Sequence, residues 1–119
     1  MSLPKFNPDQ TPADFEALLE QARKASELLK ALSHESRLLI LCLLAEGEKS
    51  VSELEEIMNM PQAAVSQQLA RLRFDRLVNT RREGRVIYYS IASAEVSSVI
   101  ETLYDLFCAS VRKPEPRAR

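Results

Sequence analysis

Residues 50–91 read SVSELEEIMNMPQAAVSQQLARLRFDRLVNTRREGRVIYYSI, and this stretch decides the fold. The segment Ser50-Val-Ser-Glu53 is a capping box, in which a hydroxyl at the N-cap and a carboxylate three residues later satisfy each other's backbone amides. It predicts a short helix whose apolar face consists of Val51, Leu54, Ile57 and Met58. Asn59-Met-Pro61 predicts the end of this helix and the start of another, with Pro61 at the first helical position, where no amide hydrogen bond is required.

The second predicted helix has two different faces. Apolar residues recur at positions i, i+4 and i+7 on one face, where they are Val65, Leu69 and Leu72. The opposite side carries small, amide and basic side chains, namely Gln62, Ala63, Ser66, Gln67, Ala70 and Arg71. A small, amide-rich face suits a helix that lies in the major groove of DNA.

A β-hairpin is predicted after this helix. Residues 77–80 and 86–91 alternate as strands do, and Arg81-Arg-Glu-Gly-Arg85 lies between them. Gly84 supplies the positive φ that a tight hairpin turn requires. A helix-turn-helix followed by an arginine-tipped wing is a device for reading DNA.

Two groups of DNA contacts follow from this arrangement. The residues expected to contact base edges in the major groove are Gln62, Ser66 and Gln67, with Ala63 making close or methyl contact. The residues expected to neutralise phosphate or enter the minor groove are Arg71, Arg81, Arg82 and Arg85.

Three further helices are predicted around this unit. Thr11-Pro-Ala-Asp14 predicts the start of a long helix that runs to about residue 32. Ser33 is expected to cap a helix that is buried, because residues 38–44 are apolar nearly all round. Ser93 is expected to start the last helix. The predicted fold is mainly α with a small β-hairpin, a five-helix winged helix-turn-helix over residues 11–111, with a disordered arm at 1–10 and a basic disordered tail at 112–119.

The charge of the chain is divided unevenly along its length. The whole sequence of 119 residues has a net charge of −1. Residues 1–60 contain 6 basic and 11 acidic residues, a net charge of −5, whereas residues 61–119 contain 10 and 6, a net charge of +4. DNA binding requires a locally basic surface rather than a basic protein. The charge distribution is therefore compatible with a DNA-binding second half.

The sequence predicts a cytoplasmic protein without catalytic activity. No apolar run approaches the ~20 residues of a membrane helix, and the first residues contain no secretory signal. In such a compartment Cys42 and Cys108 are not expected to form a permanent structural disulfide. Two glycines cannot build a glycine-rich phosphate loop, and no CxxC pair or recognisable nucleophile–base set is present, so we expect no enzyme.

Several blocks of sequence, in order, resemble the winged-helix repressors of the ArsR/SmtB family. They are Ala31-Leu-Ser-His-Glu-Ser-Arg-Leu-Leu-Ile-Leu41, Ser52-Glu-Leu54, Gln62-Ala-Ala-Val-Ser-Gln-Gln-Leu-Ala-Arg-Leu72, Leu77-Val78 and Arg82-Glu-Gly-Arg-Val-Ile-Tyr-Tyr89. The resemblance covers residues 32–91, about half of the chain. It implies a homodimer formed through the first and last helices, which binds a near-palindromic operator in double-stranded DNA. The alternative of a helix that only covers its own core stays open for the first helix.

Metal sensors in this family use cysteines in the first helix of the helix-turn-helix, or histidine with carboxylates on the last helix. Residues 51–58 contain no cysteine, and the last helix has Glu101 and Asp105 but no histidine. The single histidine, His34, lies near a helix start and is expected to act in capping or packing. We therefore expect neither a metal site nor a cofactor.

The two cysteines fall in blocks that resemble one branch of the family. These blocks are Leu41-Cys42-Leu43, residues 48–55, residues 62–73 and Tyr104-Asp-Leu-Phe-Cys108, and they are similar to the sulfide-responsive SqrR/BigR-type repressors. In that branch the two matching cysteines are a sensor pair, joined on oxidation by a disulfide or polysulfide. The resemblance implies that persulfide or polysulfide is the inducer and that the bridge releases the operator. Arg112 follows Cys108 by one helical turn, and Glu46 follows Cys42 by one turn. A nearby cation lowers the pKa of a thiol and a nearby anion raises it, so we predict that Cys108 reacts first.

Other interpretations stay open at this point. Free cysteines are often small apolar core residues, in which case a repressor of the same fold would respond to another trigger, such as a metal or peroxide, or to none. A winged helix can also serve as a protein–protein adaptor. The arginines on the second helix and the wing argue against the adaptor.

Overall fold

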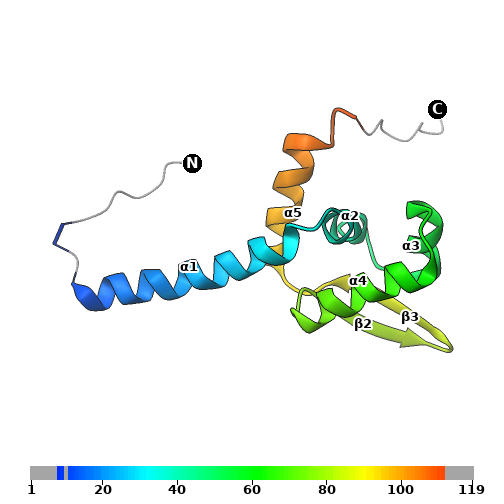
Figure 1. The fold of residues 1–119 in the computed structure, drawn as a ribbon, viewed down its shortest axis with the longest axis horizontal. Helices are drawn as coiled ribbons and strands as arrows, with labels where there is room; N and C mark the ends of the chain where they lie inside the picture. Colours follow the sequence, from blue (N-terminus) through cyan, green and yellow to red (C-terminus); the bar gives the residue numbers. More distant parts are fainter. Residues whose placement is uncertain (1–7, 10, 112–119) are drawn as a thin grey trace.

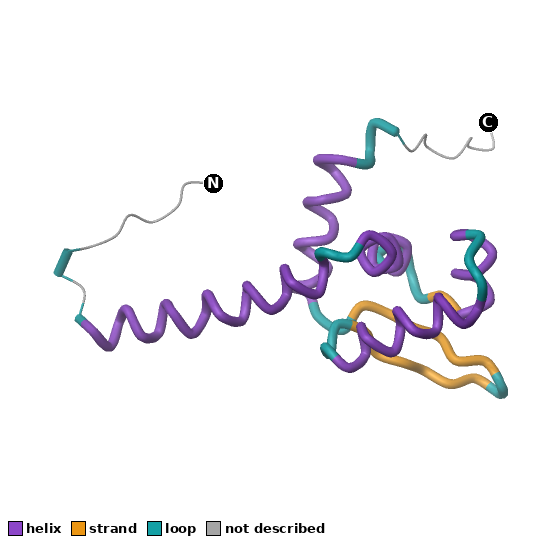
Figure 2. Tube along the Cα trace, in the orientation of Figure 1, coloured by secondary structure: helices purple, strands orange, loops and turns teal. Residues whose placement is uncertain are grey.

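The computed structural model describes residues 8–9 and 11–111. In chain order the elements are α1 (Pro12–Leu32), α2 (Glu35–Leu44), β1 (Lys49–Ser50), α3 (Val51–Met58), α4 (Gln62–Phe74), β2 (Val78–Glu83), β3 (Val86–Ile91) and α5 (Ala94–Phe107). Figures 1 and 2 show α2 to α4 gathered over the hairpin, with α5 beside α2 and α1 projecting from this body. The predicted mainly helical fold with a wing is confirmed. The predicted arm, apart from residues 8–9, and the whole basic tail lie outside the described residues.

Side-chain caps begin three of the helices as predicted. Thr11 and Asp14 form a capping box at α1. Ser50 and Glu53 form another at α3, where the Ser50 amide donates to Glu53 Oε1 at 2.8 Å and the Glu53 amide donates to Ser50 Oγ at 3.2 Å. Ser93 Oγ accepts from the backbone amide of Val96 and so caps α5. These local bonds fix the helix starts from residues adjacent in sequence.

Two predicted helix starts were placed one residue off. Ser33 does not cap α2; it is the C-cap residue of α1, and its hydroxyl donates to the Lys30 carbonyl at 2.7 Å. The N-cap of α2 is His34, which makes no side-chain capping bond. Pro61 is the N-cap of α4 rather than its first helical residue, because its ψ of 148° is extended and its carbonyl accepts the first amides of the helix.

The sheet has three antiparallel strands in the order β1-β3-β2, one more than the predicted hairpin. Residues 81–83, expected in the turn, extend strand β2, so that Glu83 pairs with Val86 and only Gly84 and Arg85 form the tip. Gly84 has the predicted positive φ, at 63°. Strand β1 has no recognisable sequence pattern, because it is two residues long and Ser50 is at once a strand residue and the N-cap of α3.

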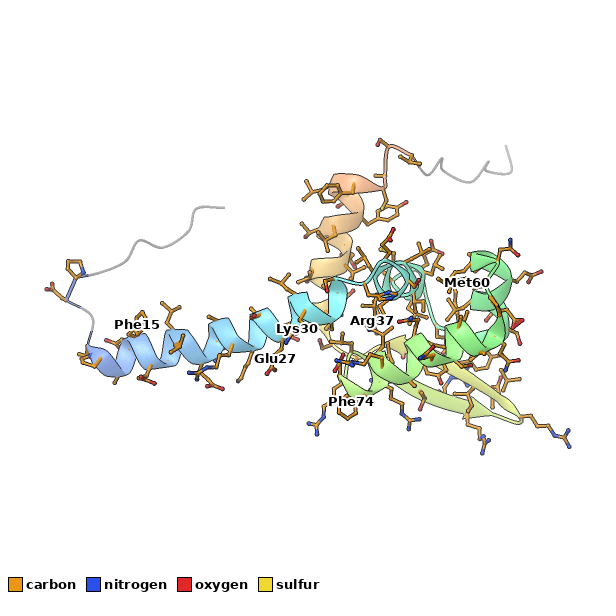
Figure 3. All side chains as sticks on the ribbon, in the orientation of Figure 1. Phe15, Glu27, Lys30, Arg37, Met60 and Phe74 are labelled. Carbon is orange, nitrogen blue, oxygen red and sulfur yellow. The ribbon has the colours of Figure 1, made fainter. Side chains whose placement is uncertain are left out.

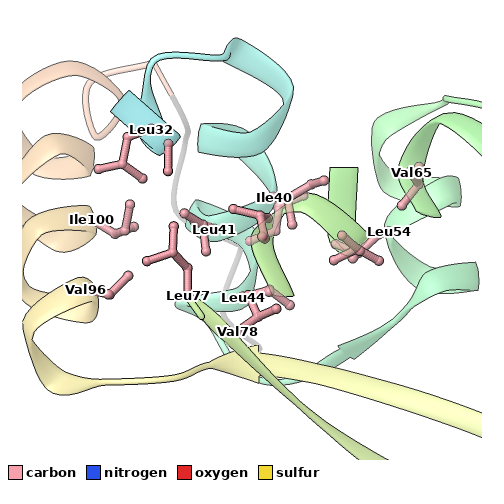
Figure 4. Packing of buried hydrophobic residues seen from close by; sticks show 14 residues of the cluster. Leu32, Ile40, Leu41, Leu44, Leu54, Val65, Leu77, Val78, Val96 and Ile100 are labelled. Atoms are coloured by element: carbon pink, nitrogen blue, oxygen red, sulfur yellow. The ribbon is translucent and has the colours of Figure 1, made fainter. Parts of the chain in front are cut away.

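The core lies where α2, α4, α5 and the base of the hairpin meet (Figure 4). Ile40, Leu41, Leu54, Leu69 and Ile100 are completely inaccessible to solvent. Burying such a side chain contributes roughly 1.5–3 kcal/mol. The expectation that α2 is buried all round was wrong on one side, because Leu39 is 48% exposed and Cys42 is only half-buried.

The first and last helices leave apolar side chains uncovered in the single chain. Helix α1 buries only Ala31 and Leu32, and Phe15 lies on the part that projects from the body (Figure 3). The exposed large apolar residues of these two helices are Phe15, Leu18, Leu29, Leu106 and Phe107. Within the described residues, none of the helices combines the length and apolar character needed to cross a membrane.

Candidate DNA interface and thiol pair

The recognition helix α4 is held by one buried stripe. Val65, Leu69 and Leu72 have no solvent-exposed area and pack into the core. Between α3 and α4, Asn59 takes a left-handed conformation with φ of 53°, which reverses the chain within a short turn. The two helices are therefore fixed relative to each other by packing at one face and by the turn at one end.

The predicted base-reading residues lie outside the buried stripe of α4. Gln62, Ala63 and Gln67 are exposed, and Ser66 is half-buried. Arg71, also exposed, forms an ion pair with Asp75 at 3.1 Å. Phe74, at the end of the same helix, is 80% exposed and points away from the core in Figure 3. The sequence pattern did not single out Phe74.

The four predicted arginine contacts do not have equivalent surroundings. Arg81 lies within β2, where its Nε donates to Glu48 Oε2 at 3.1 Å and its Nη1 lies 3.4 Å from Glu83 Oε2. Its guanidinium also stands 4.7 Å from the centroid of the Tyr88 ring. The hydrogen bond from Arg81 lowers the pKa of Glu48, and the same bond raises the pKa of Arg81. Arg81 therefore joins the wing to the loop after α2, and its charge is already compensated.

Arg82 and Arg85 have a different environment at the end of the wing. Both are exposed, Arg82 near the end of β2 and Arg85 in the turn itself. Among the described residues, neither of them forms an ion pair with a carboxylate. Their charges are thus available to phosphate, which distinguishes them from Arg81.

Cys42 and Cys108 line the same cavity at the junction of α2 and α5. Cys42 lies on α2, and Cys108 is the C-cap residue of α5, with its amide donating to the Tyr104 carbonyl at 2.8 Å. The two helices pack side by side (Figure 1). Both cysteines are half-buried, no disulfide joins them in this structure, and the cavity has a volume of about 320 Å³. The other residues lining it are Leu39, Leu43, Tyr104, Phe107 and Val111. The fold thus brings together two residues that are far apart in sequence.

A second cavity, of about 330 Å³, adjoins Cys42. It is lined by Cys42, Ala45, Glu46, Ile100, Glu101, Tyr104 and Asp105. Tyr104 borders both cavities, a role that its place in the sequence motif did not reveal. Arg112, which supported the prediction that Cys108 reacts first, lies outside the described residues.

His34 and the carboxylates do not gather around a common point. His34 is exposed at the start of α2. Within residues 8–9 and 11–111, no group of three or more His, Cys, Asp or Glu side chains is placed to hold a metal ion.

Comparison with known proteins identifies the family. Residues 34–80 match the family described as bacterial regulatory protein, arsR family. The transcriptional activator HlyU of Vibrio cholerae is 44% identical over 97 residues, which span 82% of this chain and 90% of the relative. The biofilm growth-associated repressor of Xylella fastidiosa is 40% identical over 106 residues, spanning 89% of this chain and 90% of the relative.

Solved structures of related regulators share the fold. The structure of reduced HlyU from Vibrio cholerae superposes with a TM-score of 0.75 at 45% identity and covers 78% of this chain and 98% of that one. The repressor BigR from Xylella fastidiosa gives a TM-score of 0.76 at 39% identity, covering 83% and 98%. These relatives are named as transcriptional regulators, not as enzymes. The chain belongs to the ArsR family of bacterial DNA-binding transcriptional regulators.

Proposed function

We propose that the protein is a cytoplasmic, homodimeric repressor that releases its operator when persulfide or polysulfide joins Cys42 to Cys108. The observation that carries the proposal is that both thiols line one apolar cavity between α2 and α5. A cysteine that only filled the core would be enclosed by side chains, whereas these two thiols are half-buried beside open volume.

The sulfur chemistry balances without a cofactor. A thiolate attacks the sulfane sulfur of a carrier persulfide R–S–SH, a new S–S bond forms, and the carrier leaves as R–S⁻. The second cysteine thiolate then attacks the protein sulfur of the resulting Cys–S–SH and expels hydrosulfide, which gives a disulfide. The two thiols are oxidised, and the sulfane sulfur is reduced to sulfide. Condensation of two protein persulfides releases H₂S and leaves one additional sulfur in the bridge.

The volume of the cavity affects how many sulfur atoms the bridge can contain. A direct disulfide requires Cα atoms within roughly 7 Å, whereas each added sulfur lets the bridge span a wider gap. A cavity of about 320 Å³ beside both thiols leaves room for added sulfur atoms. We therefore expect persulfide to link the thiols more readily than hydrogen peroxide, which supplies no sulfur.

The dimer places two recognition helices on DNA. The projecting part of α1 and the free end of α5 expose Phe15, Leu18, Leu29, Leu106 and Phe107, which a second copy would cover. A two-fold dimer then presents two α4 helices to successive major grooves, about 34 Å apart on a near-palindromic site. Because α2 packs against both α4 and α5, a bridge from α2 to α5 shifts the recognition helix relative to the dimer face. A coupling of about 1–3 kcal/mol suffices for a 5–150-fold loss of affinity.

Mass spectrometry of the intact protein tests the thiol chemistry directly. After treatment with cysteine persulfide, we expect one species in which neither thiol reacts with iodoacetamide and proteolysis yields one cross-linked peptide pair. Cys42→Ala and Cys108→Ala should each stop at a single alkylatable persulfide. Bridges exclusively between subunits, or two thiols that both stay alkylatable, would contradict the proposal.

A further inference from the structure

The wing is supported at its base by a third strand, which does not extend to its tip. Strand β1 pairs with β3 at residues 88–89, and there the sheet has three strands. Residues 82–83 and 86–87 pair with each other across the hairpin, lie beyond the end of β1 and are exposed. A two-stranded hairpin is only marginally stable by itself. The direction in which the tip points is therefore set at the base of the wing.

Arg81 lies at the boundary between the base and the tip. It is opposite Tyr88 in the register of β2 and β3, and Tyr88 is in turn opposite Ser50 of β1. The Arg81 guanidinium stands 4.7 Å from the centroid of the Tyr88 ring. Its Nε donates to Glu48 Oε2 at 3.1 Å, and its Nη2 donates to Glu48 Oε1. Arg81 thus reaches across the middle strand and connects β2 to the residue that precedes β1.

The contact between Arg81 and Glu48 has a geometry that fixes orientation. The two side chains are 48% and 40% exposed, and most ion pairs at such a surface contribute little to stability. Two N–H···O bonds from one guanidinium to one carboxylate, however, define a direction as well as a distance. Glu48 lies two residues before Ser50, the N-cap of α3. The contact therefore ties the base of the wing to the first helix of the helix-turn-helix.

We propose that Glu48 and Arg81 are positioning residues for DNA binding, whose contact holds the wing at the angle that brings Arg82 and Arg85 to the DNA while α4 lies in the major groove. The inference rests on the proposed DNA contacts of these two wing arginines and is independent of the thiol chemistry. Arg82 and Arg85 both lie on the tip side of Arg81, so a change in the direction of the hairpin at Arg81 displaces both charges.

The sign of one substitution separates positioning from a simple charge effect. Glu48 is an anionic side chain in contact with the wing. If only charge mattered, its removal would strengthen binding to the polyanionic DNA. If Glu48 positions the wing, its removal weakens binding, because the charges of Arg82 and Arg85 are no longer held in place. The two effects therefore change the affinity in opposite directions.

Titrations of the reduced protein with a duplex of the DNA upstream of its own gene measure the effect. We expect Glu48→Ala to weaken binding about two- to fivefold. Arg81→Lys should weaken it similarly although the charge is kept, because an ammonium lacks the planar fork of a guanidinium. Glu56→Ala is the matched control, since it removes an exposed carboxylate from α3, and it should leave the affinity unchanged or raise it.

The weakening should depend on the two wing arginines. In a variant that already carries Arg82→Ala and Arg85→Ala, Glu48→Ala should no longer weaken binding, because no charge at the tip remains to be positioned. Stronger binding by Glu48→Ala in the otherwise wild-type protein would overturn the proposal, and so would an equal loss in both backgrounds. If Arg82→Ala with Arg85→Ala leaves the affinity unchanged, the proposed wing contacts are wrong and the inference falls with them.

Hydrogen exchange in the DNA-free protein distinguishes a displaced wing from a destabilised fold. Glu48→Ala should speed the exchange of backbone amides in residues 82–87, while the amides of α2 and α4 keep their wild-type rates. Faster exchange in all of these segments would show that the loss of affinity follows from general destabilisation, which would contradict a positioning role.

Discussion

The wing and recognition helix differ from the thiol junction in how tightly their side chains are held. In the first region, Leu54, Val65, Leu69 and Leu72 are completely buried, and Arg81 ties the hairpin to Glu48. In the second region, α2 and α5 also bury Ile40, Leu41 and Ile100, but both thiols are half-buried and Cys42 borders two cavities. A DNA reader requires fixed geometry, whereas a chemical sensor requires access and room to move. Under the proposed function, these two demands fall on different parts of the molecule.

Truncating one leucine in each region tests that difference with the largest expected effect. Leu54→Ala removes a completely buried side chain and should lower the free energy of unfolding by about 3 kcal/mol. Leu39→Ala, at a side chain that is 48% exposed beside the cavity, should cost about 1 kcal/mol or less. Urea denaturation of the reduced protein measures both. Equal losses would show that the junction of α2 and α5 is packed as tightly as the helix-turn-helix.

The next largest expected effect is a loss of discrimination between operator bases. Gln67→Ala should reduce discrimination at one operator base pair by about 1–3 kcal/mol while leaving non-specific binding nearly unchanged. Gln68→Ala, a partly buried amide at the next position of the same helix, is the matched control and should leave specificity intact. Affinities for the operator and for single-base variants of it measure the effect. A uniform loss on all sequences would remove Gln67 from the base-reading group.

The wing arginines are predicted to differ although they are neighbours in sequence. Arg82→Ala should weaken binding to every DNA sequence and flatten the dependence of log affinity on log salt by about one unit. Arg81→Ala should change this salt slope less, because Glu48 and Glu83 already compensate its charge. Titrations at several salt concentrations measure both slopes. A larger change for Arg81→Ala than for Arg82→Ala would reverse our assignment of the two residues.

The smallest predicted effect is a pH dependence of the contact between Glu48 and Arg81. Because the hydrogen bond from Arg81 lowers the pKa of Glu48 in the folded protein, the contact stabilises the fold above the ordinary pKa of a glutamate. That contribution is lost as the pH falls through the lowered, folded-state pKa. The stability difference between wild type and Glu48→Gln should therefore be present near neutral pH and disappear in acid. Glu83→Gln is the comparison variant, and a difference that grows in acid would contradict the assignment.

The helix-turn-helix and the wing could be predicted from sequence because their signals are local. The capping box at Ser50 and Glu53, the turn at Asn59 and the positive φ of Gly84 each depend on residues within a few positions. Strand β1 could not be predicted, since two residues carry no periodicity and their pairing with β3 is made by the tertiary fold.

The thiol junction required the structure. The sequence suggested a pairing of Cys42 with Cys108 only through a family resemblance, because nothing local connects α2 with α5. The two cavities that border Cys42 depend on how these helices pack, and so does the position of Tyr104, which lines both of them. The compensation of Arg81 by Glu48 was equally hidden, because the two residues lie on different elements.

The most direct test of the account is the affinity of the protein for the DNA upstream of its own gene, measured reduced and after persulfide treatment, with the intact mass recorded on both samples. We predict a 5- to 150-fold loss of affinity, about 1–3 kcal/mol, that accompanies an intramolecular bridge and is abolished by Cys42→Ala or by Cys108→Ala. If the mass shows that the bridge is complete but the affinity is unchanged, the central claim that the thiol pair controls DNA binding is contradicted.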